Sequence, residues 1–445
     1  FKPVELEKGV RLSPIALPNQ EVSTMELSRA KGTRDFLPEE KILRQQVENT
    51  LKNIFERYGF SPAETPILER FDVLASKYAG GEEILKETFK LKDQGDRDLG
   101  LRYDLTVPLA RVVAMNPTVK MPFRRYQIGV VFRDGPLKAG RYREFTQCDV
   151  DVVGAFSVKQ DAELINLATD AFKALNLKVS IKVNNRKIID ALLEAAGVQE
   201  GKRNAVILCI DKLEKLGLDA VKKELQEKGI FTECVDNICA WISAKGTNEQ
   251  KIKELKKILL EKEGLMEMEK LLSYAPEAVF DCSLARGLSY YTGTIFEVFA
   301  ENSHISSSIA AGGRYDKMIG LFRGSGAIPA VGLSFGLDTI MDVIKAQQKE
   351  VKRSVTQVFV LPIKTFPESW RVTQELREAG INTEIDMLDR NVSKNFDYAN
   401  TMGISYVVVL GPEEIKERKI KVRNMQSGKE ELTTTKQFIK KLMRT

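Results

Sequence analysis

Residues 132–154, FRDGPLKAGRYREFTQCDVDVVG, constrain the fold of this chain more than any other segment. They read as two β-strands joined by a basic loop. A period of two along the second strand, expected over residues 145–153, gives an apolar face and a face of acceptors formed by Gln147, Asp149 and Asp151. Acceptors are costly to bury without partners, so this sheet carries either a structural ion-pair network or a preformed site for a polar ligand.

Positive charge gathers around the same hairpin. Arg133 follows the first strand, YQIGVVFR, while Lys138, Arg141 and Arg143 lie along the loop. Cations and carboxylates therefore converge from neighbouring strands, and both interpretations stay open at this point.

Length and composition indicate a globular protein of two or three domains. The 445 residues exceed one ordinary core, 43% are apolar and 29% are charged. The 68 basic and 62 acidic residues give a net charge of +6, which permits a nucleic-acid partner without requiring one. The chain contains one histidine, His304, expected in a polar surface loop, so a histidine triad or a His-rich metal site is all but excluded.

Several features predict a cytoplasmic protein. The five cysteines form no CxxC pair and lie in mostly apolar surroundings, as expected of reduced core thiols. No stretch is long and apolar enough to cross a bilayer. The start of the chain lacks the basic and apolar regions of a signal peptide, Met25 could be an alternative start, and the role of residues 1–24 stays open.

The pattern of apolar residues divides the chain into parts. Helical spacing over residues 39–58 precedes an extended segment, SPAETPILE, whose two prolines indicate an edge strand. Residues 186–272 are helical and rich in lysine and glutamate, which indicates an insertion. After the charged segment KAQQKEVKRSV, strands alternate with short helices, as is typical of a small α/β domain.

Three further segments carry candidate chemistry. In RYDLT, a strand would place Asp104 and Thr106 on one face, where they suit an ammonium group; a salt bridge and cap at the strand end is the simpler interpretation. In ARGLSYYTG, Arg286 precedes Tyr290 and Tyr291, and a buried guanidinium would need an anionic partner. The paired glycines of AAGGRYD allow a ligand or another backbone to approach closely, and a plain bulge fits equally well.

These segments share an order along the chain that resembles a known family. The segments that carry the resemblance are, in order, KGTRDFLP, LRYDLTVPLAR, VFRDGPLKAGRYREFTQCDVDVVG, ARGLSYYTGTIFE, AAGGRYD and AVGLSFGLD. Over residues 29–445, the chain resembles the class II histidyl-tRNA synthetases of the archaeal and eukaryotic type. The resemblance implies an α+β fold: an antiparallel sheet with flanking helices, a helical insertion domain and a C-terminal α/β anticodon-binding domain. The implied divisions are an N-terminal extension of unknown role (1–28), a catalytic domain in two parts (29–185 and 273–345), the insertion domain (186–272), a linker (346–354) and the anticodon-binding domain (355–445).

The resemblance also implies an activity. Such an enzyme attaches L-histidine to tRNA(His) through a histidyl adenylate, with ATP as substrate and Mg²⁺ on its β- and γ-phosphates. It would be a cytoplasmic homodimer with no membrane contact, and the dimer would form through motif 1, which ends near Pro66.

Site residues follow from the same resemblance. Arg133 and Arg286 would be the catalytic residues, and both would hold the α-phosphate. The residues implied to bind histidine are Asp104, Thr106 and Gln147 at the α-ammonium, Asp151 and Tyr291 at the imidazole, and Tyr290. The residues implied to bind ATP are Arg133, Arg141, Glu144 and Phe145, with Phe145 stacked on adenine. No residue is implied as a metal ligand.

One departure from the family pattern bears on activity. Thr339 stands where class II enzymes carry the motif 3 arginine that packs on ATP, and Arg314 and Arg323 are candidates to replace that cation. The substitution favours an alternative, a non-catalytic paralogue such as a regulatory or tRNA-sensing subunit. Retention of Arg133 and Arg286, together with the C-terminal domain, favours the enzyme.

Overall fold

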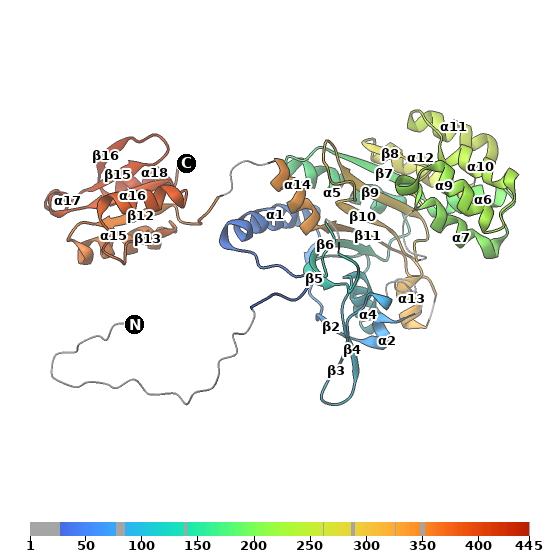
Figure 1. The fold of residues 1–445 in the computed structure, drawn as a ribbon, viewed down its shortest axis with the longest axis horizontal. Coiled ribbons are helices and arrows are strands. Elements are labelled where there is room, and N and C mark those ends of the chain that lie inside the picture. Colours follow the sequence, from blue (N-terminus) through green and yellow to red (C-terminus); the bar gives the residue numbers. More distant parts are fainter. Residues whose placement is uncertain are drawn as a thin grey trace.

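The computed structural model describes residues 27–76, 85–137, 140–260, 262–285, 290–324, 326–347 and 352–444 (Figure 1). Lys138 and Arg286 therefore lie outside the described residues. All statements below on missing partners refer to the described ranges.

An eight-stranded sheet forms the centre of the larger part of the chain. Its order is β1-β5-β6-β11-β10-β9-β7-β8, antiparallel except for the parallel edge pairs β1–β5 and β7–β8. The strands are β1 (Ser61–Pro62), β5 (Phe123–Phe132), β6 (Glu144–Val153), β7 (Val179–Asn185), β8 (Ala278–Phe280), β9 (Thr294–Ala300), β10 (Ala310–Arg314) and β11 (Ala330–Gly336). The expected antiparallel sheet is confirmed, as is the strand at residues 145–153, which begins one residue earlier.

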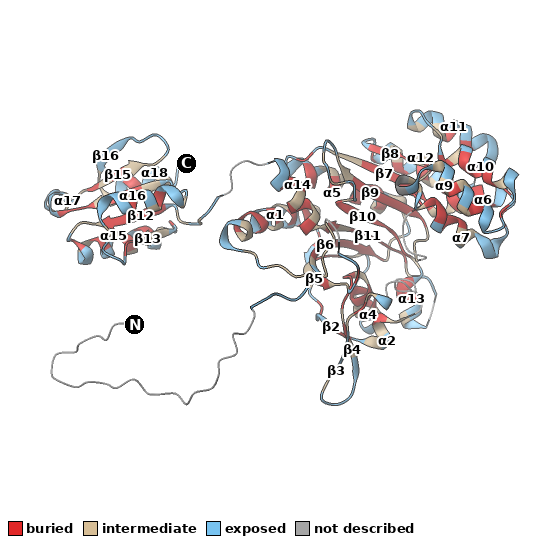
Figure 2. Cartoon of the chain, viewed as in Figure 1, coloured by how far each residue is buried: buried red, intermediate tan, exposed pale blue. Residues whose placement is uncertain are grey.

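Three helices cover one face of this sheet: α1 (Pro38–Arg57), α5 (Val158–Ala174) and α14 (Leu337–Gln347). Their apolar residues pack on the apolar face of β6, which carries Cys148, Val150 and Val152. Figure 2 shows the resulting buried layer along the central strands. The acceptor face of β6 consequently points to the opposite side of the sheet.

Smaller elements border that opposite face. Helices α4 (Thr106–Met115) and α13 (Met318–Arg323) pack together, and a three-stranded sheet of order β2-β4-β3 lies beside the short helix α2 (Phe71–Leu74). Its strands are β2 (Leu68–Arg70), β3 (Lys90–Lys92) and β4 (Asp98–Leu101). β4 ends before Asp104, so the expectation that a strand places Asp104 and Thr106 on one face is wrong.

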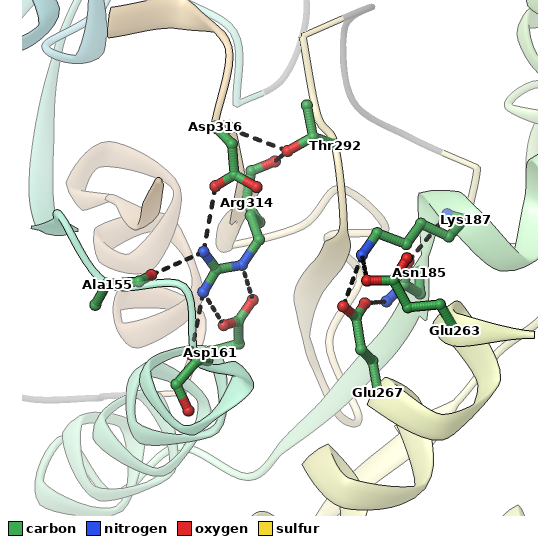
Figure 3. A network of polar contacts seen from close by, with 10 residues as sticks. Ala155, Asp161, Asn185, Lys187, Glu263, Glu267, Thr292, Arg314 and Asp316 are labelled. Carbon is green, nitrogen blue, oxygen red and sulfur yellow. Dashed lines mark hydrogen bonds and ion pairs between the residues drawn. The ribbon is translucent and has the colours of Figure 1, made fainter. Parts of the chain in front are cut away.

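Seven helices connect β7 to β8. They are α6 (Arg186–Ala195), α7 (Glu200–Ile210), α8 (Leu213–Leu216), α9 (Leu218–Glu227), α10 (Thr232–Ile242), α11 (Asn248–Leu259) and α12 (Glu263–Tyr274). Residues of α6, α7, α9 and α10 share a separate apolar core, whereas α11 and α12 contribute to the main one. At the start of α6, Lys187 bonds to Glu263 and Glu267 of α12, which joins the two ends of the insertion (Figure 3).

The C-terminal part is a five-stranded sheet of order β13-β12-β14-β15-β16 with four helices. Strands and helices alternate as expected up to β15, which β16 follows directly as an antiparallel partner. Its strands are β12 (Val358–Pro362), β13 (Thr383–Ile385), β14 (Tyr406–Leu410), β15 (Ile420–Asn424) and β16 (Glu430–Thr433), and its helices are α15 (Phe366–Glu378), α16 (Val392–Thr401), α17 (Pro412–Glu417) and α18 (Thr435–Leu442). It has apolar cores of its own on both faces of the sheet, which confirms the small α/β domain.

Candidate active site

A floor of small residues lies beside the acceptors of β6. In the strand register, Gln147, Asp149 and Asp151 stand opposite three small residues of β11, which in turn neighbour two of β10. Directly opposite residues share a face of the sheet. The floor consists of Gly332, Ser334 and Gly336 on β11 and Ala311 and Gly313 on β10. Because no long side chain rises from these five positions, other side chains can lie over them: Asp151 and Tyr315 lie over Gly332, and Tyr291 lies over Gly313.

Asp151 is buried at one end of the acceptor row, with 2% of its surface exposed. One carboxylate oxygen accepts from the Tyr315 hydroxyl at 2.5 Å, and the other lies 2.8 Å from Nη2 of Arg125. A Cβ on Gly332 would lie 2.0 Å from the first oxygen, so only glycine fits opposite Asp151. Burial raises the pKa of the Asp151 carboxyl, although both donors favour its ionised form.

Gln147 and Asp149 are linked through Ser334. Gln147 Nε2 donates to Ser334 Oγ at 2.9 Å, and the Ser334 hydroxyl bonds in turn to the Asp149 carboxylate. Gln147 Oε1 and Asp149 Oδ1 are buried and have no hydrogen-bond partner among the described residues. Burial raises the pKa of Asp149 to about 7, with Arg125 opposing the shift and Asp151 adding to it.

Asp104 reaches the site from the loop before α4, and Thr106 is the first residue of that helix. The Asp104 carboxylate accepts the backbone N–H of Val107 at 3.0 Å, so it caps the helix, as the simpler interpretation held. Burial raises its pKa to about 6, against the effect of this hydrogen bond and of nearby Arg133. The capping role and a substrate role are compatible, because a carboxylate accepts several hydrogen bonds.

Arg133 and Phe145 lie together at the hairpin end of β5 and β6. Arg133 Nε donates to the Tyr103 carbonyl at 3.1 Å, and its guanidinium carbon lies 5.1 Å from the centroid of the Phe145 ring. Glu144, exposed, opens β6. Both oxygens of Glu87 accept from Arg141 Nη2, at 2.6 and 2.7 Å, so this expected ATP-binding cation has a protein partner in the structure.

Two tyrosines stand over the other side of the floor. The ring centroids of Tyr290 and Tyr291 are 4.5 Å apart, and the Tyr290 ring lies edge-on to Tyr315 at 6.4 Å. A Cβ on Gly313 would come within 3.0 Å of the Tyr291 ring, so the glycine allows the ring to approach the strand. Burial raises the pKa of both tyrosine hydroxyls.

Arg314 has a structural role in this region (Figure 3). Its Nε and Nη2 bond to Asp161 at 3.1 and 2.5 Å, and its Nη1 bonds to the Ala155 carbonyl and to Asp316. Its carbonyl accepts the backbone N–H of Thr292, directly after the tyrosine pair, at 2.8 Å. The expectation that Arg314 could replace the missing cation at ATP is therefore wrong, since all three of its nitrogens bond to protein acceptors, among them both oxygens of the fully buried Asp161.

Thr339 is half-buried in the first turn of α14. The preceding residue, Asp338, bonds to Arg34 and, at 2.8 Å, to Arg44. The Arg34 guanidinium also lies over the Tyr142 ring at 3.4 Å. Arg34 and Arg44 are thus already paired with Asp338, and Arg323, the other candidate, is exposed at the end of α13.

Sequence reasoning missed three residues that hold the acceptor row: Arg125, Ser334 and Tyr315. Two lie in segments already singled out, AAGGRYD and AVGLSFGLD, and all three are polar side chains within or next to sheet strands. Within the described ranges, no group of three or more His, Cys, Asp or Glu side chains could hold a metal ion. No helix in the same ranges has the length and apolarity needed to span a membrane.

Comparisons with known proteins agree with this geometry. The family described as histidyl-tRNA synthetase matches residues 32–340, and the family described as anticodon binding domain matches residues 357–445. The chain is 44% identical to histidine–tRNA ligase 1 of Bacillus anthracis over 415 residues, which cover 91% of this chain and 97% of that protein.

Solved structures show the same likeness. Histidyl-tRNA synthetase from Nostoc sp. PCC 7120 has a TM-score of 0.85 at 32% identity, over 94% of this chain and 99% of that chain. An ATP phosphoribosyltransferase regulatory subunit/histidyl-tRNA synthetase from Bacillus halodurans has a TM-score of 0.72 over 86% of this chain and 97% of that one; at 22% identity it shares the fold alone. The relatives named here are bacterial, so the archaeal and eukaryotic subtype stays a prediction.

Proposed function

Because this chain belongs to the histidyl-tRNA synthetase family, we propose that it attaches L-histidine to tRNA(His) in an ATP-dependent reaction through histidyl adenylate. A histidine carboxylate oxygen attacks the α-phosphorus of ATP, and the bond to pyrophosphate breaks. The terminal ribose hydroxyl of the tRNA then attacks the adenylate carbonyl and releases AMP. The observation that carries the proposal is the buried row of acceptors beside a floor of glycine, alanine and serine. This row and floor lie within residues 32–340, which the family matches.

The acceptor row would bind the amino acid. Asp104, Thr106 and Gln147 would hold the α-ammonium, and Asp151 and Tyr291 would bond to the imidazole nitrogens, with Tyr290 packed against Tyr291. A hydrogen bond from Tyr315 and an ion pair with Arg125 hold the Asp151 carboxylate in place, which fixes the group that would bond to the imidazole. A site built this way would favour histidine, because a side chain without an N–H group would cover the buried carboxylate and give it no further hydrogen bond.

The hairpin end would bind ATP. Phe145 would stack on adenine, Arg133 would contact the α-phosphate and the histidine carboxylate, and Arg141 would exchange Glu87 for the polyphosphate. Glu144 would border the adenine. Arg286, which lies outside the described residues, would stabilise the charge that builds on the α-phosphate in the transition state.

Mg²⁺ fits this site as an ion held chiefly by phosphate oxygens and water, with few or no protein ligands. The residues around the hairpin end are consistent with that, since Glu87 and Asp134 are already paired with Arg141 and Arg143. The ion would neutralise the charge of the β- and γ-phosphates and of the leaving pyrophosphate.

The remaining parts of the chain would bind the tRNA and form the homodimer. We propose residues 29–185 and 273–345 as the catalytic domain, 186–272 as the insertion domain, 346–354 as the linker and 355–445 as the anticodon-binding domain. Motif 1 would form a homodimer interface, supported by two exposed apolar residues directly after Pro66, Ile67 at 43% and Leu68 at 51%. The five free cysteines support a cytoplasmic location.

An aminoacylation assay with histidine, ATP, Mg²⁺ and total tRNA tests the function. Histidine should be charged, and no other amino acid should replace it. Adenylate formation without any charging, or no ATP binding at millimolar concentration in the presence of histidine, would instead support the non-catalytic paralogue.

A further inference from the structure

Asp149 is the one member of the acceptor row to which the proposed function gives no role. It lies between Gln147 and Asp151 on the same face of β6, and it is 3% exposed. One carboxylate oxygen bonds to the Ser334 hydroxyl, while Oδ1 is buried and has no donor among the described residues. Buried acceptors are almost always satisfied, so Oδ1 is expected to have a donor in the working complex.

No neighbouring protein donor bonds to Asp149 Oδ1: Nε and Nη1 of Arg125 are buried and have no acceptor among the described residues either. Arg125 directs Nη2 to Asp151 and to the Leu105 carbonyl. Gln147 directs its N–H group to Ser334, which leaves its own Oε1 free and buried next to Asp149. Two adjacent acceptors without donors, one of them a carboxylate, form a place for a group with several N–H bonds and a positive charge.

Position along the strand selects which substrate group this is. Alternate residues of a strand are about 7 Å apart, so Asp149 lies one such step from Gln147 and one from Asp151. Asp151 stands at the proposed imidazole end and Gln147 at the proposed ammonium end. The imidazole is already partnered by the Asp151 carboxylate and Tyr291 in the proposed complex. The ammonium group carries three N–H donors and a full positive charge, so it needs more acceptors.

We propose that Asp149 is a further substrate-binding residue, whose Oδ1 accepts a hydrogen bond from the α-ammonium group of histidine beside Gln147 Oε1. The proposal rests on the proposed function, because it takes the position of the histidine from it. Ser334 acts as a positioning residue: its hydroxyl bonds to Asp149 and accepts the Gln147 amide, so that one oxygen of each side chain is left for the substrate.

The test compares two tight-binding analogues of the adenylate in the full-length protein. One is 5′-O-(N-histidylsulfamoyl)adenosine, and the other carries a hydroxyl in place of the α-ammonium group. For Asp149→Asn, which keeps the shape and the bond to Ser334, we expect the amino analogue to bind about 10- to 100-fold more weakly, the range for a lost charge-assisted hydrogen bond. The affinity for the hydroxyl analogue should change by less than about threefold.

Asp151→Asn is the matched control, two residues along the same strand. Both analogues carry the imidazole, so this substitution should weaken the binding of both analogues by a similar factor. If Asp149→Asn weakens both analogues equally, or weakens neither, the ammonium contact is overturned. If Asp151→Asn leaves both unchanged, the proposed imidazole pocket is wrong, which is a separate failure of the proposed function.

Thermal unfolding separates binding from a structural role. Burial disfavours the ionised form of Asp149, so asparagine should leave the melting temperature unchanged or raise it. A lowered melting temperature together with equal loss of both analogues would show that Asp149 only supports the fold, and would overturn the proposal.

Discussion

Replacing Asp151 with alanine should destabilise the fold as well as impair histidine binding. The change removes the acceptor of the Tyr315 hydroxyl and the carboxylate that faces Arg125, which is 1% exposed. Nε and Nη1 of Arg125 already lack an acceptor among the described residues, so the guanidinium would retain little beyond the Leu105 carbonyl.

The magnitude follows from this geometry. Removing one partner of a buried ion pair typically destabilises a protein by about 3–5 kcal/mol, because the other charge stays buried. The raised pKa of Asp151 shows that burial already disfavours its ionised form, so the loss should fall near the lower value, about 3 kcal/mol. Asp151→Asn keeps an oxygen for Tyr315 and should lose less, about 1–2 kcal/mol.

Equilibrium urea unfolding of four proteins measures the effect: the parent, Asp151→Ala, Arg125→Met and the double variant. The decreases in the free energy of unfolding of the two single variants should together exceed the decrease in the double variant by about 1–3 kcal/mol, as for residues in direct contact. A loss below about 1 kcal/mol for Asp151→Ala, or an additive cycle, would show that the pair contributes nothing to stability.

Binding is tested with the milder variant. In pyrophosphate exchange, Asp151→Asn should raise the KM for histidine far more than the KM for ATP, because only the imidazole loses its carboxylate. Equal increases for both substrates would remove Asp151 from the imidazole pocket.

Three other changes test the remaining parts of the proposal. Arg286→Ala should reduce adenylate formation about 10²- to 10³-fold in kcat while histidine binding survives, and near-normal pyrophosphate exchange would refute its transition-state role. Deletion of residues 351–445 should preserve pyrophosphate exchange and sharply reduce tRNA charging; unchanged tRNA affinity would contradict the anticodon-binding assignment. Thr339→Arg should lower the KM for ATP about 2- to 30-fold if a guanidinium packs on adenine, since such contacts contribute about 0.5–2 kcal/mol. An unchanged KM would show that another group already compensates.

Local sequence patterns predicted the sheet and its row of polar side chains, because the direction of a side chain in a strand depends only on its position along that strand. Alternation along β6 needs only the strand period, and the structure places Asp149 and Asp151 on the face away from α1, α5 and α14. The same rule failed at Asp104, which lies three residues beyond the end of β4 and caps α4 instead. A carboxylate before a helix and a carboxylate within a strand look alike in a short segment.

Partners that are distant in sequence could not be predicted in this way. Tyr315 lies 164 residues from Asp151, and Arg314 lies 153 residues from Asp161, so only the folded sheet brings each pair together. Arg314 was a reasonable candidate for an ATP-binding cation on sequence position alone. The structure shows that its side chain instead joins β10 to α5.

The parallel pairing of β7 with β8 limits how this protein can change during evolution. Parallel neighbours cannot be joined by a tight turn, since the chain must return along the whole strand before it pairs again. The helices between Asn185 and Ala278 are that return path, and the segment that follows β8 leads directly to Arg286. The middle helices also pack toward the sheet, because their apolar core includes Leu284 and Ala285 after β8 and Ile295 of β9. A lineage that lost the whole insertion would lose the connection that makes β7 and β8 parallel neighbours, so some crossover must persist wherever this pairing does.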